Sequence, residues 1–531
     1  MKKSLFLYIT FLLAIGNLNS QVNTNKIVCQ VLDKTSNKPI VYATVMLKDI
    51  YRGTHADYNG KFEIPSKYRS KEIIKISSIG YRTKEIKLSK LKTTGLNIIY
   101  LTVSNSSLDE IVITTSKKKK RLLAKQIVRK AIKNISENYP NQPHSYIGYY
   151  RDYQQPVGNS YQKSIKSEKP IEYINVNEGI LESFDNGFKT DKLKNKKNQT
   201  LLYNLTSNNN FIQDSSLTVP YDNKSKKYSE SVYITPLGGN ELNLLDLTNA
   251  IRNHNKMSFS FTNIFDKDFL VNHFFKVKEI TYLDDTPLYK IYFYSLKDKT
   301  SYEYAAYGHI YISKGDFAIH KLNYNLYYQK KKNPQYAVTI EYREKRNKMY
   351  LNYISFNNFF EATNGNYFKV DKTIYNSKNN VFKISFNRQI NADYIEPVSR
   401  NFKIYYKGMK LKIAGINLSK NNTRTVELYI DQKSAQKIDF DKEKENPNYA
   451  NYFTFEIKNL KDIDGFKINL RPSIKLNQYR ELFVQEVFEN KNLPQDMNFV
   501  DKNSPLSKTI ITNKNFKDSY WINSPLKKSK N

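Results

Sequence analysis

One short stretch, RGTHADYNGKFEIP (residues 52–65), gathers residue types that can bind a metal ion: His55, Asp57 and Asn59 alternate and are followed by Gly60. A calcium loop of the EF-hand type needs an acid at its first position and a bidentate Glu at its twelfth. His55 stands where that first acid would be, and no Glu occupies the twelfth position. Asp57 and Asn59 can instead bond their local backbone, and Gly60 can adopt positive φ. The stretch is therefore interpreted as a tight turn between strands.

The histidines also lack the spacing of a zinc peptidase, which needs a His and a Glu three residues apart and a further His. His309 and His320 flank a predicted hairpin and could face each other across it, either as a shared site or as packed sheet residues. No nucleophile elbow, Walker loop or dinucleotide fingerprint is present. Acids are plentiful, but the sequence does not single out a glycosidase pair. We therefore predict no catalytic residue, no cofactor and no metal site.

The chain is unusually rich in tyrosine, with 43 residues of this type. A tyrosine side chain offers a flat apolar body and a hydroxyl group, which suits both sheet packing and the recognition of glycans or peptides. Many tyrosines alternate along predicted strands, which favours packing. If the large β region holds a ligand, the first ligand-facing candidates are Tyr324, Tyr328, Tyr336 and Tyr342.

The first twenty residues predict export. A basic start at Lys2 and Lys3 precedes the apolar run Leu5–Ile15, and a polar stretch follows up to Ser20. This is the pattern of a secretory signal peptide with cleavage after Ser20, and its apolar run is too short to span a bilayer. The chain has a single cysteine, Cys29, which excludes an internal disulfide and a cysteine-based metal cage. The expected location is periplasmic or associated with the outer membrane.

The formal net charge of +35 is compatible with anionic partners such as nucleic acid, lipid phosphates or acidic glycans. Lysine is scattered along the chain, however, and its densest run is Lys117–Arg121. An exported protein does not meet nucleic acid in its normal environment, so no nucleic-acid partner is expected. The remaining candidates are envelope proteins and an apolar or glycan ligand, with peripheral membrane contact as a further option.

Residues 24–104 predict a compact all-β unit, because short strand-like segments alternate with turn signals. Several motifs here resemble the carboxypeptidase regulatory-like domain, which is common in exported proteins of the Bacteroidetes lineage. The resemblance implies a prealbumin-like seven-stranded β-sandwich that accompanies other domains and is not itself catalytic. The motifs are Val31-Leu32-Asp33, Lys38-Pro39-Ile40, Ala43-Thr44-Val45, Gly53-Thr54, Asp57-Tyr58-Asn59-Gly60-Lys61-Phe62 and Ser77-Ser78-Ile79-Gly80-Tyr81, with Leu108–Ile113 resembling the segment that usually follows the domain.

Residues Leu122–Tyr139 predict an amphipathic helix that ends at Pro140. Its apolar face could pack on the next domain and leave a solvated basic face, or the helix could lie on an anionic membrane surface. We favour packing.

From Pro143 to about Phe488 the pattern is mostly β. The segments Lys321–Tyr328 and Tyr336–Tyr342 alternate polar and apolar residues and predict an antiparallel hairpin with one face buried, followed by Tyr350–Phe356. This region also resembles uncharacterised exported Bacteroidetes proteins that carry the same N-terminal domain, and this second resemblance implies no activity. It is carried by Ile127–Ile132, Gly148–Arg151, Tyr307–Ile312 and Tyr479–Glu486.

The predicted fold class is mainly β: an N-terminal prealbumin-like seven-stranded sandwich, one linking amphipathic helix and a larger antiparallel β-rich domain. The predicted function is a non-catalytic binding or assembly protein of the cell envelope. An envelope hydrolase acting on glycan or peptide and an accessory component of an outer-membrane receptor are the alternatives. The domains are expected at 1–20 (signal peptide), 21–104 (sandwich), 105–140 (linker strand, basic run and helix), 141–490 (β-rich domain) and 491–531 (polar C-terminal tail).

Overall fold

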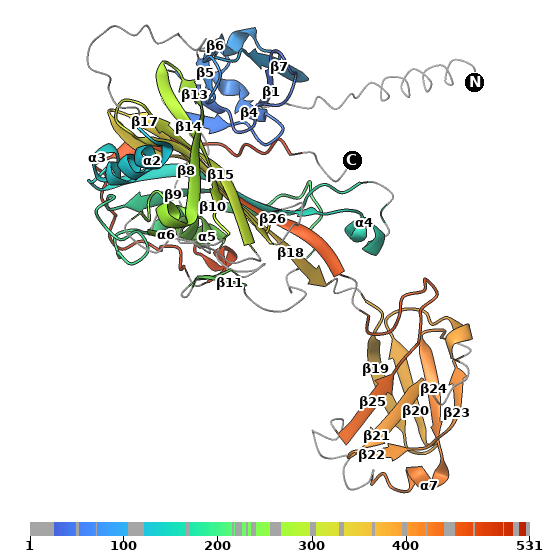
Figure 1. Ribbon diagram of the computed structural model, residues 1–531. Coiled ribbons are helices and arrows are strands. Elements are labelled where there is room, and N and C mark those ends of the chain that lie inside the picture. The colour runs from blue at the N-terminus through green and yellow to red at the C-terminus, as the bar shows by residue number, and fades with distance from the viewer. Residues whose placement is uncertain are drawn as a thin grey trace, which may run out of the picture.

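A computed structural model shows two β-sandwiches at opposite ends of a long curved sheet (Figure 1). The expected signal peptide (1–20), Leu108–Ile113 and the basic run Lys117–Arg121 lie outside the described residues. The structure describes residues 26–48, 52–70, 72–104, 122–165, 167, 170–214, 217, 226–229, 232–234, 241–254, 267–297, 304–328, 334–363, 367–395, 401–419, 422–439, 452–470, 473–502, 504–512 and 520–526.

The N-terminal sandwich has two sheets that enclose a core around Ile27, Cys29 and Phe62. Burial alternates strictly along its first strand, as expected for a strand with one face on a core. One sheet has the order β4 (Lys61–Pro65), β1 (Lys26–Asp33), β7 (Leu96–Leu101); the other has the order β3 (Arg52–His55), β2 (Thr44–Leu47), β5 (Ile73–Ser77), β6 (Lys84–Lys87), with short 3-10 turns η1 (Ser66–Tyr68) and η2 (Leu88–Lys90).

The large sheet is antiparallel and has ten described strands. The predicted hairpin is confirmed, because Leu322 pairs with Ile340 and Tyr324 with Val338, and Lys345 then turns to Lys348. The mainly β fold class is confirmed as well. The strand order is β10 (Thr200–Ser207), β9 (Ile174–Asp185), β8 (His144–Pro156), β26 (Ser473–Glu489), β18 (Lys348–Thr363), β17 (Tyr336–Lys345), β16 (Ile319–Tyr328), β15 (Tyr304–Ser313), β14 (Thr286–Ser295), β13 (His273–Leu283).

The inner face of this sheet packs against short helices, and we define the inner face by that contact. Ile127, Val128 and Ala131 of the first helix are buried there, while Lys125 and Arg129 are exposed, so the favoured packing of the predicted amphipathic segment is confirmed. That segment divides into two helices at Asn134. The helices on this face are α2 (Ala124–Lys133), α3 (Ile135–Asn138), α5 (Glu241–Thr248) and α6 (Lys267–Asn272).

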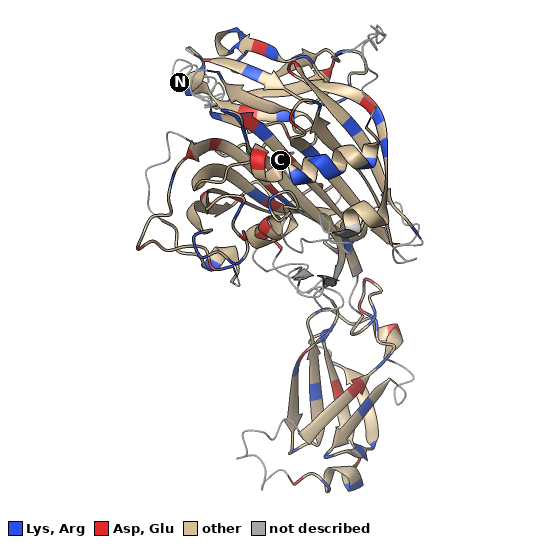
Figure 2. Cartoon of the chain, turned by 60° about the vertical axis from the view of Figure 1, so that its left-hand side comes forward, with Lys and Arg blue, Asp and Glu red and all other residues tan. Residues whose placement is uncertain are grey.

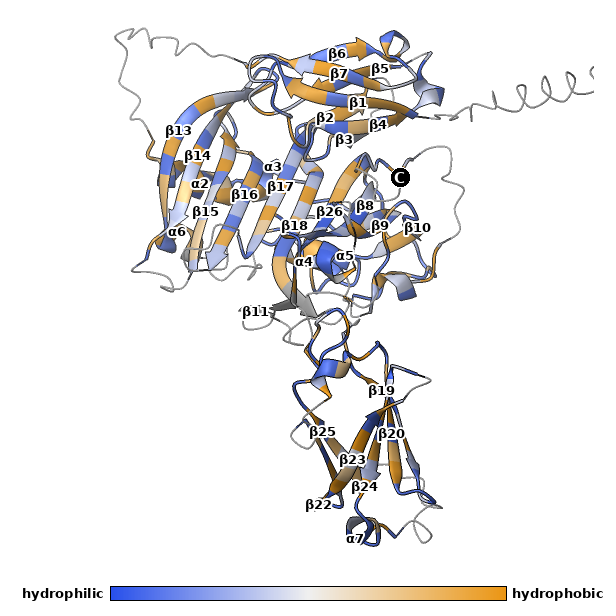
Figure 3. Cartoon of the chain, turned by 90° about the vertical axis from the view of Figure 1, so that its right-hand side faces the viewer, coloured by the Kyte–Doolittle hydropathy of each residue, from blue (hydrophilic) through white to orange (hydrophobic). Residues whose placement is uncertain are grey.

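The two halves of the sheet differ in how they are covered. β8 is buried at eleven consecutive positions, which means that both of its faces are covered. In β17, burial alternates from residue to residue, so only its inner face is covered. Figure 3 shows the alternation of polar and apolar residues along the strands of this less covered half.

A second β-sandwich, residues 367–470, is inserted between β18 and β26. It has a core of its own, built around Phe382, Ile404 and Leu428. The sequence predicts a single β-rich domain over 141–490, whereas the structure separates this sandwich from the large sheet (Figure 1). Its strands are β19 (Val370–Asn376), β20 (Val381–Phe386), β24 (Thr425–Ile430) and β23 (Ile413–Leu418) in one sheet and β22 (Met409–Leu411), β21 (Phe402–Tyr406) and β25 (Phe453–Ile457) in the other, with η4 (Ala392–Tyr394) and α7 (Gln432–Ala435) between them.

Three further secondary-structure elements lie outside the large sheet and the two sandwiches. They are α4 (Ser160–Ser164), the two-stranded ribbon of β11 (Lys226–Ser229) and β12 (Val232–Ile234), and η6 (Leu506–Lys508). Within the described part of the chain, no helix has the length and apolar character needed to cross a membrane. Acidic and basic residues are interspersed over the sheet and the sandwiches (Figure 2).

The C-terminal segment, described at residues 504–512 and 520–526, joins the N-terminal sandwich to the large sheet, although its composition predicts only a polar tail. Trp521 is buried in the core of the N-terminal sandwich, and its indole Nε1 donates to the Glu63 carbonyl at 3.1 Å. Gln485 of β26 donates to the Trp521 carbonyl at 2.7 Å. Asn523 donates to the His55 carbonyl at 2.8 Å and accepts from the Glu63 amide at 2.7 Å. One segment therefore bonds to both bodies.

We expect Trp521→Ala to lower the free energy of unfolding by about 3–5 kcal/mol, because it removes a large buried side chain and leaves a cavity. Urea unfolding measures this loss. Ile510→Ala is the control: Ile510 belongs to the same segment but is 63% exposed, so its loss should be within about 0.5 kcal/mol. Equal effects of the two substitutions would contradict the role assigned to Trp521.

Candidate ligand-binding cleft

The four tyrosines proposed as ligand-facing lie mostly in the core. Tyr324 and Tyr336 are fully buried on the inner face, and Tyr328 is half-buried, with its ring 5.3 Å from that of Tyr304. Tyr342 is buried too, but it borders a cavity. Polar and apolar residues alternate along these strands, and for most of the four tyrosines this alternation reflects packing of the ring in the core and not a ligand-facing position.

The stretch around Asp57 forms the predicted turn. One Asp57 carboxylate oxygen accepts from the amides of Asn59 and Lys61, both at 2.8 Å, and Gly60 has a φ of 70°. Among the described residues, no group of three or more His, Cys, Asp or Glu side chains is arranged to hold a metal ion.

The same stretch docks the N-terminal sandwich on the outer face of the large sheet. The His55 ring lies 5.8 Å from that of Tyr353 and 5.7 Å from that of Phe483. Burial lowers the pKa of His55 to about 3, so this imidazole is neutral. It acts as a packing residue between the two bodies.

Beside this contact the two bodies separate and leave an interdomain cleft with two adjoining cavities of about 330 and 690 Å³. One wall comes from β2, β5 and β6 of the N-terminal sandwich. The other comes from the ends of β16, β17, β18 and β26 and from the turn between β13 and β14. The side chains that border both cavities are Lys75, Arg343, Glu344, Arg346 and Asn352.

The smaller cavity has a polar lining. Thr44, Ser77 and Ser78 of the sandwich present hydroxyl groups, and Asn352 donates to the Thr44 hydroxyl at 3.0 Å. His320 on the opposite wall is 5% exposed, and its Nδ1 has no hydrogen-bond partner among the described residues. Burial lowers the pKa of His320 to about 4, which leaves a neutral imidazole with one donor and one acceptor nitrogen. This lining suits a polar ligand.

His309 and His320, which the sequence allowed to face each other across a hairpin, are not paired. In the β15–β16 pair His309 stands opposite Asn323, and its ring lies 5.4 Å from that of Tyr292. His320 reaches the cleft instead. Sequence reasoning missed this site because its two walls are far apart in the chain, and no local pattern connects them.

A separate polar cluster lies on the inner face. Asp152 of β8 stands opposite Arg480 of β26, and Arg480 is bonded to Glu241 of α5 and to the Asn358 amide oxygen at 2.6 Å. Tyr150 donates to Asp152 at 3.1 Å. Burial, reinforced by the nearby Glu241 carboxylate, raises the pKa of Asp152 to about 7. Two acids converge here, but among the described residues no histidine is bonded to them, so we treat the cluster as structural.

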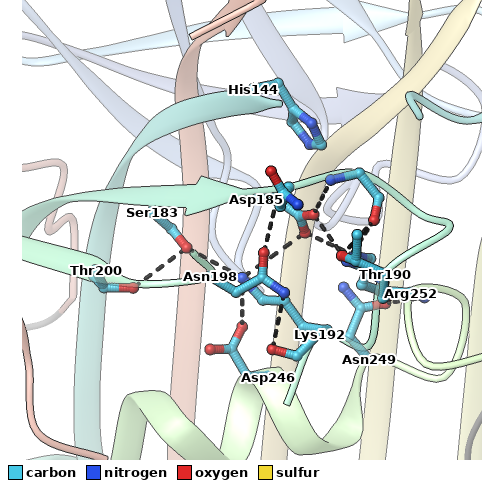
Figure 4. A network of polar contacts seen from close by, with 12 residues as sticks. His144, Ser183, Asp185, Thr190, Lys192, Asn198, Thr200, Asp246, Asn249 and Arg252 are labelled. Carbon is cyan, nitrogen blue, oxygen red and sulfur yellow. Dashed lines mark hydrogen bonds and ion pairs between the residues drawn. The ribbon is translucent and has the colours of Figure 1, made fainter. Parts of the chain in front are cut away.

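A third polar network ties the end of β9 to the segment that follows α5 (Figure 4). Arg252 is 3% exposed and binds both carboxylate oxygens of Asp185, at 2.7 and 2.9 Å. Lys192 lies 3.8 Å from Asp185 and 3.7 Å from Asp246. Burial acts to raise the pKa of Asp185, but Arg252 and Lys192 hold it well below its ordinary value. The network holds the end of β9 against the segment that follows α5.

Comparisons with known proteins identify the first domain. Residues 27–113 match the family model for the CarboxypepD_reg-like domain, which confirms the resemblance of the N-terminal sandwich. No curated protein matches the chain.

Similar solved structures include a LolA superfamily protein from Nitrosomonas europaea, with 10% identity, 45% of this chain and 86% of that chain covered, and a TM-score of 0.18. A DUF1329 family protein from Desulfovibrio piger has 10% identity, coverages of 44% and 85%, and a TM-score of 0.21. A putative outer membrane lipoprotein-sorting protein domain from Vibrio parahaemolyticus has 9% identity, coverages of 44% and 85%, and a TM-score of 0.19. TM-scores this low do not assign the large sheet to a family.

We expect Arg252→Gln to destabilise the fold by about 3–5 kcal/mol, because it leaves the buried Asp185 carboxylate without its guanidinium partner. Chemical denaturation measures the effect. Arg424→Gln, at an exposed position of the inserted sandwich, should change stability by no more than about 0.5 kcal/mol. A small loss for Arg252→Gln would mean that Lys192 alone neutralises Asp185.

Asp152 gives a prediction about pH. Its pKa is higher in the folded chain than the ordinary value of 3.8, so the folded state holds a proton that the unfolded state releases. Stability from this group is therefore complete below pH 4 and is lost as the pH rises toward 7, by about 1.4 kcal/mol per pH unit. Asp152→Asn should remove this dependence, so its stability relative to the wild type should rise between pH 4.5 and 7, at a slope of about that size. A constant difference across this range would contradict the raised pKa.

Proposed function

We propose that this chain is a non-catalytic binding protein of the cell envelope and that its ligand occupies the interdomain cleft. The observation that carries the proposal is the pair of adjoining cavities between the CarboxypepD_reg-like domain and the large sheet. Clefts between domains are a common place for small-ligand sites, and cavities of several hundred Å³ are large enough for one. The expected secretory signal supports a location in the envelope.

The lining favours a polar ligand over an apolar one. Hydroxyl, amide and charged groups surround the smaller cavity, whereas the apolar inner face of the sheet is packed against helices in the described part of the chain. A glycan or a glycan-linked peptide offers the matching donors and acceptors. The hydrolase alternative has less support, because the converging acids Asp152 and Glu241 are buried in the cluster around Arg480 and border neither cavity.

The test uses muropeptides released from peptidoglycan, titrated into the full chain by isothermal calorimetry. Ser78→Trp should abolish binding, because the indole would fill the smaller cavity that Ser78 borders. Ser89→Trp is the matched control, since Ser89 is an exposed serine of the same domain outside both cavities. Unfolding curves establish that both variants fold. Equal binding by Ser78→Trp and the wild type, or no binding by the wild type, would contradict the proposal.

A further inference from the structure

Arg343 is the most unusual residue of the interdomain cleft. It lies near the end of β17, borders both cavities and is only partly exposed. Its Nη1 atom is buried and has no hydrogen-bond partner among the described residues. A guanidinium group carries five N–H donors and remains charged, so a buried donor without a partner is unfavourable.

The cations around Arg343 do have acidic partners. Lys75 pairs with Asp284 at 3.2 Å, and Arg346 pairs with Glu489 at 3.2 Å. Glu341, two positions before Arg343, is bonded to Lys321 of the neighbouring strand. Glu344 follows Arg343 in the chain but is exposed. Of the acids that border the smaller cavity, Asp284 and Glu341 are thus paired with lysines, and no ion pair joins Glu344 to Arg343 among the described residues.

This arrangement leaves Arg343 without a carboxylate in ion-pair contact among the described residues. Burial lowers the pKa of Arg343, and the attraction of Asp284 offsets this lowering only in part. A protein usually avoids such an environment or pairs the charge. An anion that entered the cleft would supply the missing partner, and a guanidinium is the side chain best suited to bind an oxyanion through parallel hydrogen bonds.

Further donors line both walls of the smaller cavity. His320 is buried with its Nδ1 unpartnered among the described residues, and Ser77 and Ser78 border the same cavity. A neutral imidazole and hydroxyl groups can donate to an oxyanion without adding charge. The cavity therefore combines a guanidinium whose Nη1 has no partner among the described residues with several neutral donors.

We propose that the interdomain cleft is an oxyanion site centred on Arg343, which takes a phosphate or carboxylate group of the ligand. This inference rests on the proposed function and deepens it by naming the chemical class of the bound group. Phosphate and carboxylate share the chemistry that Arg343 recognises, and the experiment distinguishes them.

The probes are inorganic phosphate and glucuronate, titrated separately into the full chain by calorimetry at constant ionic strength set with sodium chloride. Arg343→Gln should weaken binding by about tenfold or more, the usual consequence of losing a charged hydrogen-bond donor. Arg343→Lys keeps the positive charge but cannot form two parallel hydrogen bonds to one oxyanion, so it should bind with intermediate affinity. Arg82→Gln is the matched control, because Arg82 is exposed on the same sandwich and borders neither cavity.

Thermal unfolding without any probe gives a second readout. Arg343→Gln should melt at the same temperature as the wild type or higher, because it removes a charge that has no partner in the ligand-free chain. The probe that binds should then raise the melting temperature of the wild type and of Arg82→Gln but not that of Arg343→Gln.

The two titrations distinguish the chemical class of the bound group. Arg343-dependent binding of phosphate supports a phosphorylated ligand, and Arg343-dependent binding of glucuronate supports an acidic glycan. Absence of binding for both probes, or equal binding by Arg343→Gln, overturns the oxyanion site. If muropeptides still bind Arg343→Gln with unchanged affinity but fail to bind Ser78→Trp, the cleft remains the ligand site and only the oxyanion assignment fails.

Discussion

The fold depends on covering the outer face of one half of the large sheet. Strands β9, β8 and β26 carry buried side chains on both faces, and the outer side presents Ile147, Tyr149 and Phe483. A sheet that is apolar on both faces is unstable in water unless a second layer covers it. The N-terminal sandwich and the C-terminal segment together form that layer, and the interdomain cleft opens where the cover ends.

A buried ion pair lies under this cover. Arg151 of β8 stands directly opposite Glu481 of β26, and its Nε donates to the Glu481 carboxylate at 2.9 Å. Tyr353 donates to the other carboxylate oxygen at 3.0 Å. Such a pair adds little net stability, since removing two charges from water is costly. A one-residue slip between the strands would separate the two charges, so the pair favours the observed register between β26 and β8.

The sequence predicted what depends on local periodicity. The strands of the N-terminal sandwich, the helix packed on the sheet and the β16–β17 hairpin follow from alternation and turn residues, and the Asp57 turn follows from its glycine. The strand that holds His55 was missed, because β3 is short and was interpreted as the start of that turn. The inserted sandwich was missed as well, because its strands have the same period as those around them and no composition change marks its borders.

The site was harder to predict, for a physical reason. Tyr324 and Tyr336 alternate as ligand-facing residues would, but the same alternation is produced by packing, and packing accounts for their burial. The sequence drew attention to His320 only as a partner of His309 and to Arg343 not at all, because the N-terminal sandwich beside them lies more than 200 positions earlier in the chain. Long-range pairing determines which charges lack partners, and a linear pattern does not record it.

The insertion of the second sandwich has a mechanical consequence. Its two connections leave from Thr363 and Ser473, which pair directly at the far ends of β18 and β26, while the N-terminal sandwich lies near the opposite ends of these strands (Figure 1). Tension between the two sandwiches would therefore run along both strands in parallel. The ladders to β17 and β8 would be loaded in shear, with many hydrogen bonds resisting at the same time, instead of being opened one by one.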